Sequence, residues 1–184
     1  MKDRYPSWER QERRTIIDSP YMKVYEDSVK LPNGTVLDDY TVVTMPSGVI
    51  IVATDRDDNL LVQYEYKYAI DKTILNLPSG TIEVGDSVLA TAARELLEET
   101  GYESSDLELI DTLYEYPSKA DHLIYIVRAK NARKTSDTAH EITETISAVK
   151  LIAPTASRRD YEGEFNTTYV VAALALTLPG YLKK

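Results

Sequence analysis

The sequence lacks several residue types on which common protein chemistries depend. It contains no cysteine, which excludes disulfides, a thiolate nucleophile and a cysteine-ligated zinc ion. Its two histidines, His122 and His140, are too few and too far apart for a convincing zinc site. No apolar run reaches the roughly 18 residues that a membrane-spanning helix needs. Residues 1–10 are highly charged, unlike a secretory signal peptide, so we expect a cytoplasmic protein.

Positive charge is also scarce. The chain has 21 lysines and arginines against 30 aspartates and glutamates, a net charge of −9. It therefore lacks the basic surface of a general nucleic-acid binder. A phosphorylated small molecule is a suitable ligand if metal ions supply the missing positive charge. The 184 residues are enough for one domain with a full core.

What is present is organised around residues 77–102, which predict a loop followed by one helix. Asp86 or Ser87 is suited to the N-cap of that helix, and Gly101 to the left-handed position that follows its last turn. At about 100° per residue, one side of the helix is mostly apolar and is expected to be buried. That side is formed by Leu89, Ala92, Ala93, Leu96, Leu97 and Thr100.

Three glutamates, Glu95, Glu98 and Glu99, are predicted on the opposite side of the same helix. Like charges at these spacings each destabilise a helix by about 0.2–0.5 kcal/mol, and Arg94 offsets only part of that repulsion. A bound divalent cation would remove it. The alternative interpretation is an ordinary solvated acidic face.

The residues around these glutamates resemble the Nudix box, G-x5-E-x7-R-E-U-x-E-E-x-G-U, in which U is an apolar residue. The match begins at Gly80 and ends with the run from Arg94 to Tyr102. Every defined position agrees except Asp86, which stands where the pattern has glutamate. That change concerns the loop-to-helix hydrogen bond there more than the chemistry. The resemblance implies an α/β fold, the Nudix-type α/β/α sandwich with a mixed β-sheet.

The resemblance also implies a role for each matching residue. Glu98 and Glu99 resemble the main metal ligands, and Glu95 resembles a residue that is a ligand in some subfamilies and a general base in others. Arg94 resembles the arginine that orients these carboxylates, and the backbone carbonyl of Ser79 a further ligand. The expected metal is Mg²⁺, which keeps several waters and binds few protein carboxylates together with substrate phosphates. Mn²⁺ is the expected substitute.

A looser resemblance, to the ADP-ribose and nucleotide-sugar pyrophosphatases, covers about residues 20–178. The segment Leu-Pro-Ser-Gly-x-Ile-Glu at 77–83 is similar to the Leu-Pro-Ala-Gly-x-Ile-Glu segment of that group. Pro117 lies 16 residues beyond Gly101, where the ADP-ribose group has a marker proline. We therefore expect Pro117 at the substrate. His122 is a candidate to line the same cleft, with an ordinary structural role as the alternative.

Residues 65–69 and 76 depart from that group. Its Gln-Tyr-Arg-Tyr-Ala segment appears as Glu-Tyr-Lys-Tyr-Ala at 65–69, so Lys67 replaces an arginine that often contacts the substrate. A lysine cannot make the same bidentate contact. Asn76 replaces a common glutamate that helps to bind the nucleotide. Tyr66 is a candidate to stack on a base, with one face of a strand or a dimer contact as the alternatives.

A glutamate on a loop before the last strand completes metal binding or supplies the general base in this group. The run Glu-Thr-Ile at 144–146 resembles the end of that loop. Glu144 is therefore the first candidate for this role and Glu141 the second. A polar surface loop is the alternative for both.

Hydrophobic periodicity and turn residues place the remaining elements. In residues 1–20 only Trp8, Ile16 and Ile17 are expected anchors, and no element is predicted. An Asn-Gly turn predicts a hairpin of two strands, and a second hairpin is expected at the centre of the sheet. The predicted strands lie near 21–31, 35–45, 49–54, 60–66, 107–116, 123–129 and 146–152.

The segment between the last two strands, 131–145, is polar and predicts a mobile loop, and residues 166–168 cap a final apolar helix at 169–178. We divide the chain into an N-terminal hairpin extension at 1–45, expected to mediate homodimerisation, and a catalytic domain at 46–184.

The predicted activity is Mg²⁺-dependent hydrolysis of the pyrophosphate bond in a nucleoside diphosphate linked to another group, such as ADP-ribose or a nucleotide sugar. The products are a nucleoside monophosphate and a sugar phosphate. Alternatives are GDP-mannose, a dinucleoside polyphosphate, or nucleotide sensing without hydrolysis. No nucleic-acid or membrane partner is expected.

Overall fold

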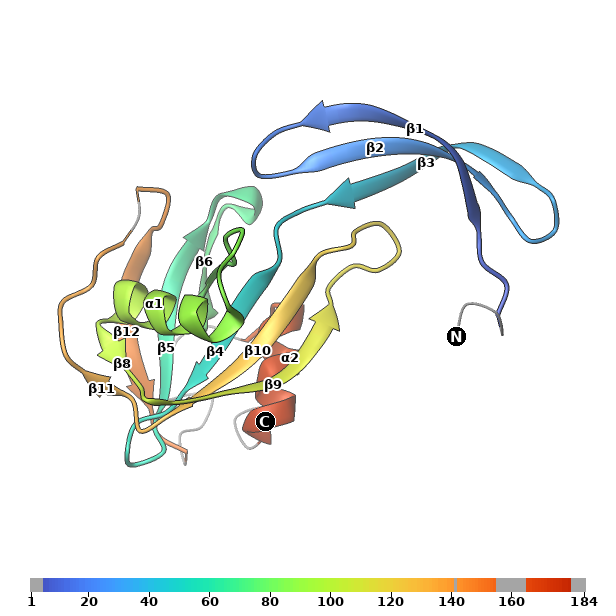
Figure 1. Ribbon diagram of the computed structural model, residues 1–184. Helices are drawn as coiled ribbons and strands as arrows, with labels where there is room; N and C mark the ends of the chain where they lie inside the picture. The colour runs from blue at the N-terminus through green and yellow to red at the C-terminus, as the bar shows by residue number, and fades with distance from the viewer. Residues whose placement is uncertain (1–4, 141, 155–164, 180–184) are drawn as a thin grey trace. The chain divides into compact units, whose positions relative to one another are not determined.

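The computed structural model describes residues 5–140, 142–154 and 165–179 (Figure 1). The chain divides into two compact units. One consists of Met1–Pro46 with Tyr114–His122, and the other of Ser47–Leu113 with Leu123–Lys184. Each unit is described separately below. Within the described ranges, no helix has the length and apolar character needed to cross a membrane.

The first unit is built on an antiparallel sheet with the strand order β1-β2-β3. Its strands are β1 (Glu9–Asp18), β2 (Lys23–Lys30) and β3 (Val36–Thr44). The predicted hairpin of β2 and β3 is confirmed, and Gly34 takes the left-handed conformation (φ 89°) in its turn. The second piece of the unit is joined by hydrogen bonds, including one from the backbone N–H of Val43 to the carbonyl of Lys119.

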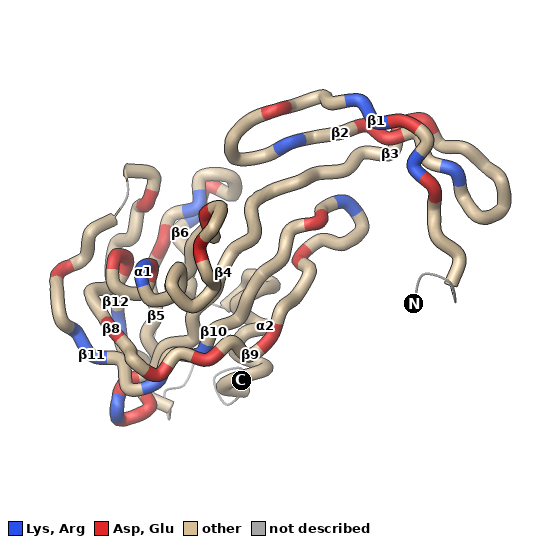
Figure 2. Tube along the Cα trace, in the orientation of Figure 1, with Lys and Arg blue, Asp and Glu red and all other residues tan. Residues whose placement is uncertain are grey.

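No element was predicted in residues 1–20, but β1 forms there. All ten residues of β1 are exposed, so the strand has no alternating buried side from which periodicity could find it. Its ladder to β2 is supported by charge pairs instead. Arg13 binds both carboxylate oxygens of Asp27 at 2.7 Å, and Arg14 pairs with Glu26 at 2.6 Å. Figure 2 shows basic and acidic residues side by side on these strands.

The described residues of the second unit form two larger sheets and one short one. The first has the order β7-β4-β10-β9, with β4 and β10 parallel, and the second has the order β12-β5-β6. A two-stranded sheet joins β11 to β8. The strands are β4 (Gly48–Ala53), β5 (Leu60–Lys67), β6 (Lys72–Asn76), β7 (Ser79–Thr81), β8 (Tyr102–Glu103), β9 (Asp106–Tyr114), β10 (Leu123–Lys130), β11 (Arg133–Lys134) and β12 (Ile146–Ile152).

The predicted central hairpin of β4 and β5 is wrong. The turn at 55–59 forms as expected, with the carboxylate of Asp55 accepting the backbone N–H groups of Asp57 and Asn59. Beyond the turn, a single bridge joins Thr54 and Leu60. A strand has only two edges, and β4 uses them for β7 and β10 while β5 uses them for β6 and β12. The two strands therefore diverge into different sheets.

Two helices cover opposite faces of this arrangement (Figure 1). They are α1 (Val88–Thr100) and α2 (Thr168–Thr177). Alternate residues of β4 separate the two cores, because Val49 and Ile51 pack with α1 while Ile50 and Val52 pack with α2. The predicted α/β/α sandwich is confirmed. Its N-terminal extension has one strand more than the predicted hairpin.

The buried side of α1 differs from the predicted one. Leu89 and Ala93, predicted to be buried, are exposed. The buried residues are instead Thr91, Ala92, Glu95, Leu96, Glu99 and Thr100. Helical periodicity predicts which side chains share a side of the helix. It does not predict which side is buried when that side contains two glutamates, because the buried side was sought among apolar residues. Glu95 and Glu99 therefore point inward rather than into solvent.

Candidate active site

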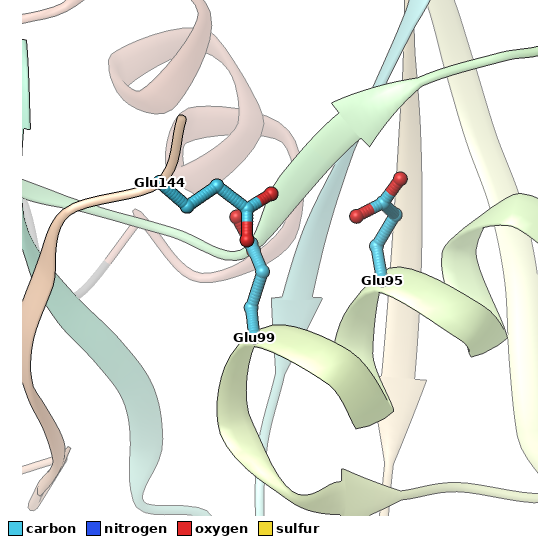
Figure 3. A group of neighbouring side chains, drawn as sticks. All are labelled: Glu95, Glu99 and Glu144. Atoms are coloured by element: carbon cyan, nitrogen blue, oxygen red, sulfur yellow. The ribbon is translucent and has the colours of Figure 1, made fainter. Parts of the chain in front are cut away.

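Three carboxylates meet beside the C-terminal half of α1. Glu95 and Glu99 come from successive turns of the helix, and Glu144 comes from the segment just before β12 (Figure 3). One oxygen from each lies within 4.8 Å of the others. Glu95 and Glu99 are buried and Glu144 is half-buried. Three ionised carboxylates at this spacing repel one another strongly. The group is therefore suited to a divalent cation bound by oxygen ligands.

Helix α1 holds two of these carboxylates in place through well-formed ends. The hydroxyl of Ser87 accepts the backbone N–H of Ala90 at 3.2 Å, so Ser87 is the N-cap. Gly101 ends the helix at φ 75°, and its N–H donates to the carbonyl of Leu97 at 2.8 Å. Asp86 is exposed just ahead of the cap.

The loop before α1 lies directly against the carboxylates. The backbone N–H of Ser79 donates to Oε2 of Glu99 at 2.8 Å. At Gly80, an added Cβ would lie 2.1 Å from the carboxyl carbon of Glu95. Glycine is the residue that permits this approach, since any side chain would occupy the position of the Glu95 carboxylate. The role predicted for the carbonyl of Ser79 as a metal ligand stays a prediction.

Arg94 bridges two glutamates of the helix. Its Nη2 donates to Oε1 of Glu95 and its Nη1 to Oε2 of Glu98, both at 2.8 Å. The arginine therefore fixes one member of the carboxylate group. Glu98 was expected among the metal ligands, but it is not a member of the three-carboxylate group that the described residues form. Its predicted role stays a prediction.

Burial changes the protonation of the two inward glutamates. Burial raises the pKa of Glu99 to about 9, the charges of Glu65 and Glu144 add to this, and the N–H of Ser79 opposes it. Burial also raises the pKa of Glu95 to about 7, against the opposing charge of Arg94. Without a cation the group holds protons near neutral pH. A cation that replaced those protons would neutralise the same negative charge.

The segment that carries Glu144 is attached on both sides of that residue. Before it, the ring Nε2 of His140 lies 3.0 Å from the carbonyl of Glu99, and the N–H of Ala139 donates to the carbonyl of Glu98 at 2.7 Å. After it, the carbonyl of Thr145 accepts the N–H of Tyr66 at 3.0 Å. The segment predicted as a mobile loop thus contains β11 and several contacts to α1 and β5. Glu141 lies outside the described residues.

The four residues predicted to bind substrate are distributed over both units. In β5, the ammonium of Lys67 contacts the carboxylate of Glu65, and the hydroxyl of Tyr66 donates to Asp71 at 2.8 Å. Pro117 and His122 belong to the first unit. His122 is buried and its Nε2 lies 2.7 Å from Glu115. Their predicted contacts with a substrate stay predictions.

Sequence reasoning did not recognise a buried polar group beside the carboxylates. Gln63, Glu65 and Asn76 are buried on β5 and β6, and Nδ2 of Asn76 donates to Oε2 of Glu65 at 2.8 Å. The available signal was the alternation along 61–67, which places one apolar and three polar residues on a single face of a strand. Polar residues on a buried strand face require hydrogen-bond partners, so this alternation could have predicted a buried polar group.

Comparison with known families agrees with this arrangement. The NUDIX domain model matches residues 44–171. The chain belongs to the NUDIX family. A second model, described as the nucleoside diphosphate sugar hydrolase N-terminal domain, matches residues 8–43, which contain β1, β2 and most of β3. The match to the NUDIX domain includes α1 and Glu144, so the three carboxylates lie within the family's domain.

Individual relatives show how far the similarity extends. A methanol dehydrogenase activator from Bacillus methanolicus is 32% identical, over 67% of this chain and 66% of that protein. An ADP-ribose pyrophosphatase from Bacillus subtilis is 29% identical, over 64% of this chain and 63% of that protein. The chain thus aligns with slightly less than two thirds of each. A crystal structure of an ADP compounds hydrolase has a TM-score of 0.74 and 26% identity, covering 93% of this chain and 91% of that one.

Proposed function

We propose that this NUDIX protein hydrolyses the pyrophosphate bond of a nucleoside diphosphate linked to another group, in a reaction that depends on Mg²⁺. The three-carboxylate group of Glu95, Glu99 and Glu144 carries the proposal. Its donors are all carboxylate oxygens, which suit Mg²⁺ or Mn²⁺ and suit softer metals poorly. The raised pKa of Glu99, about 9, supports the same assignment, because burial penalises its ionised carboxylate and a bound cation would offset that penalty. Residence in the cytoplasm is part of the same proposal.

In this proposal the chain's own residues position the reactants. Glu95, Glu99 and Glu144 hold the cation, with Glu98 and the carbonyl of Ser79 as further candidate ligands. When bound, Mg²⁺ neutralises charge on the phosphoryl oxygens and lowers the pKa of a bound water. Arg94 holds Glu95 by a hydrogen bond, and the N–H of Ser79 holds Glu99. Glu144, on a segment attached at both sides, and Glu95 are the candidates to accept a proton from the attacking water.

The substrate class rests on the relatives and on the sequence segment before α1. Relatives named ADP-ribose pyrophosphatase and a structural neighbour named ADP compounds hydrolase favour ADP-ribose or a similar nucleotide sugar. Hydrolysis of ADP-ribose would give AMP and ribose 5-phosphate. Within the same family, GDP-mannose and dinucleoside polyphosphates are the alternative substrates. Binding of a nucleotide without hydrolysis is the alternative of another class.

A substrate panel tests the proposal. The purified chain is incubated with ADP-ribose, nucleotide sugars including GDP-mannose, and dinucleoside polyphosphates, with Mg²⁺ or with EDTA, and products are resolved by ion-exchange chromatography. The expected result is a nucleoside monophosphate and a sugar phosphate, in Mg²⁺ alone. Absence of products from every compound would reject hydrolysis. Calorimetry that then showed tight ADP-ribose binding would establish the sensing alternative.

A further inference from the structure

Strand β5 carries a row of polar side chains on the face that lies against α1. Leu61 begins this face, since it packs in one core cluster with Leu96 of α1. Side chains alternate along a strand, so Gln63, Glu65 and Lys67 follow on the same face. Gln63 and Glu65 are buried. Burial of polar groups costs free energy unless they are paired, so a row of this kind requires a reason.

Glu65 joins the row to the neighbouring strand β6. One of its oxygens accepts Nδ2 of Asn76 at 2.8 Å, and the other accepts the ammonium of Lys67. Asn76 is fully buried, and it lies opposite Gln63 in the register of the two strands. Because both oxygens of Glu65 are bound by donors, the carboxylate cannot rotate freely. It fixes the head groups of Lys67 and Asn76 in turn.

The two side chains that meet here are exchanged relative to the pyrophosphatase pattern. That pattern has glutamine at position 65 and glutamate at position 76, whereas this chain has Glu65 and Asn76. Since Glu65 and Asn76 hydrogen-bond to each other, the pair still consists of one carboxylate and one carboxamide. The negative charge has moved from β6 to β5, where Lys67 replaces the arginine of the pattern. The three departures, at positions 65, 67 and 76, therefore belong to one hydrogen-bonded group and compensate one another.

This set lies beside the carboxylate group. The charge of Glu65 acts on Glu99, and Tyr66, between Glu65 and Lys67, is bonded through its backbone to Thr145, next to Glu144. The side chain of Lys67 is 37% exposed, whereas that of Glu65 is 8% exposed. An ammonium has three N–H donors, and its contact with Glu65 uses one. Glu65 thus holds a partly exposed ammonium, and its own charge acts on the carboxylate group.

We propose that Glu65 is a positioning residue for the substrate, holding Lys67 so that its ammonium binds the diphosphate of a nucleoside diphosphate derivative beside the carboxylate group. This inference rests on the proposed function. A lysine is a flexible point charge, whereas an arginine presents a planar fork that is already organised for phosphate. The lysine therefore needs a partner that aims it, and a carboxylate at position 65 supplies one that the pattern's glutamine does not.

The test is a double-mutant cycle between the two strands. Glu65→Gln, Asn76→Glu and the double variant are compared with wild type for kcat and KM on ADP-ribose in Mg²⁺, and for the Kd of ADP-ribose by calorimetry in EDTA. Glu65→Gln should raise KM and Kd about tenfold while kcat changes less than about threefold, as for a lost binding contact. The double variant returns a carboxylate to the pair, but at position 76 instead of 65. KM and Kd should therefore stay as high as in Glu65→Gln, because Lys67 still lacks the carboxylate that aims it.

Two further variants separate the lysine's contribution from net charge. Lys67→Met should raise KM and Kd about as much as Glu65→Gln, because both remove a positioned ammonium. Lys130→Met changes the net charge equally at an exposed position at the end of β10 and should leave both constants unchanged. Thermal unfolding of every variant is measured in parallel.

The outcomes distinguish the inference from the proposed function. If wild type hydrolyses no compound of the panel, the proposed function fails, and the binding constants in EDTA still decide the inference. The inference is overturned if Glu65→Gln leaves KM and Kd unchanged, or if the double variant regains the KM and Kd of wild type, since a carboxylate at position 65 would then not be required. It is also overturned if KM and Kd of the variants simply follow their melting temperatures, since Glu65 would then be merely structural.

Discussion

Gly80 and Glu95 approach so closely that a Cβ on the glycine would lie 2.1 Å from the carboxyl carbon of the glutamate. The contact joins the loop before α1 to the middle of that helix. The backbone of Gly80 lies so close to Glu95 that no side chain fits between them. The atoms in conflict belong to the end of a side chain. A substitution at position 80 is therefore expected to displace the Glu95 carboxylate rather than the backbone.

Gly80→Ala should therefore lower kcat by about 100-fold, because misplacing a reacting group by about 1 Å costs this much. The protein should stay folded, with a melting temperature within a few degrees of wild type. Gly48→Ala is the matched control, since its Cβ would meet its neighbours at 3.4 Å. Steady-state kinetics and differential scanning fluorimetry measure both variants. Full activity in Gly80→Ala would contradict the close approach of loop and helix.

Glu99→Gln should lower turnover by at least two orders of magnitude while the protein stays folded, because it removes a charge from the centre of the carboxylate group. Glu98→Gln should also lower turnover, because it removes one of the two negative charges that pair with Arg94. Glu103→Gln, at an exposed position in β8, is the control. Turnover is measured at saturating Mg²⁺ and substrate. Rates like those of wild type in both Glu98→Gln and Glu99→Gln would reject the metal-dependent chemistry.

The metal-free protein should lose stability as the pH rises from about 5 to 9. The pKa of Glu99 is about 9 in the folded state and 4.5 when unperturbed, so the folded state binds the proton more tightly. That preference stabilises the fold fully below pH 4.5 and is lost as the pH rises towards 9. Each pKa unit corresponds to about 1.4 kcal/mol, so the change is on the order of several kcal/mol.

Thermal unfolding in EDTA across this pH range measures the effect. Glu99→Gln cannot ionise at this position, and its melting temperature should vary less with pH than that of wild type. Mg²⁺ should raise the melting temperature of wild type most at alkaline pH, because its ligands must be deprotonated. A melting temperature that rose from pH 5 to 9 in EDTA would be the opposite sign and would contradict the burial of Glu99 in its protonated form.

His140→Ala should weaken Mn²⁺ binding and lower kcat by about 10- to 100-fold, the usual effect of losing a residue that orients metal ligands. A carbonyl oxygen only accepts, so Nε2 of His140 must donate to the carbonyl of Glu99. His140→Gln keeps an N–H donor and should retain most of the activity. Calorimetric titration with Mn²⁺ follows the binding. Equal losses of Mn²⁺ binding and kcat in both variants would show that the hydrogen bond from His140 to Glu99 does not support the carboxylate group.

The chain should form a homodimer. Strand β1 is exposed along its whole length, and it presents Ile16 and Ile17 at 49% and 44% exposure. Apolar side chains on an exposed strand favour association with a second sheet. Multi-angle light scattering at micromolar concentration should give about twice the chain mass of 20.8 kDa. Ile16→Lys combined with Ile17→Lys should shift the mass towards the monomer, and a monomeric wild type would reject the prediction.

The carboxylate helix could be predicted because its information is local. Glu95, Glu98 and Glu99 are neighbours on one helix whatever surrounds it, and the caps at Ser87 and Gly101 mark its ends. The same holds for the hairpin of β2 and β3 around its Asn-Gly turn. In each case the spacing along the chain determines the geometry.

The wrong predictions concern which partner an element meets. The residues of β4 and β5 satisfy every local criterion for a hairpin, yet other strands occupy both edges of each. Strand β1 has no apolar alternation, so its pairing with β2 depends on charges such as those of Arg13 and Asp27. Pairing between distant segments is a property of the whole fold, and a local pattern does not contain it.

The sequence alone determined that this protein carries a helix with three clustered glutamates behind a glycine loop, because helical periodicity brings those residues together without help from the rest of the chain. Only the tertiary structure decided that Glu95 and Glu99 face inward while Glu98 stays partly exposed, since packing selects which arc of a helix is buried. It also brought Glu144 to them and set Glu65 against Asn76. These contacts join residues far apart in the chain, and their energies depend on burial, which exists only in the folded state.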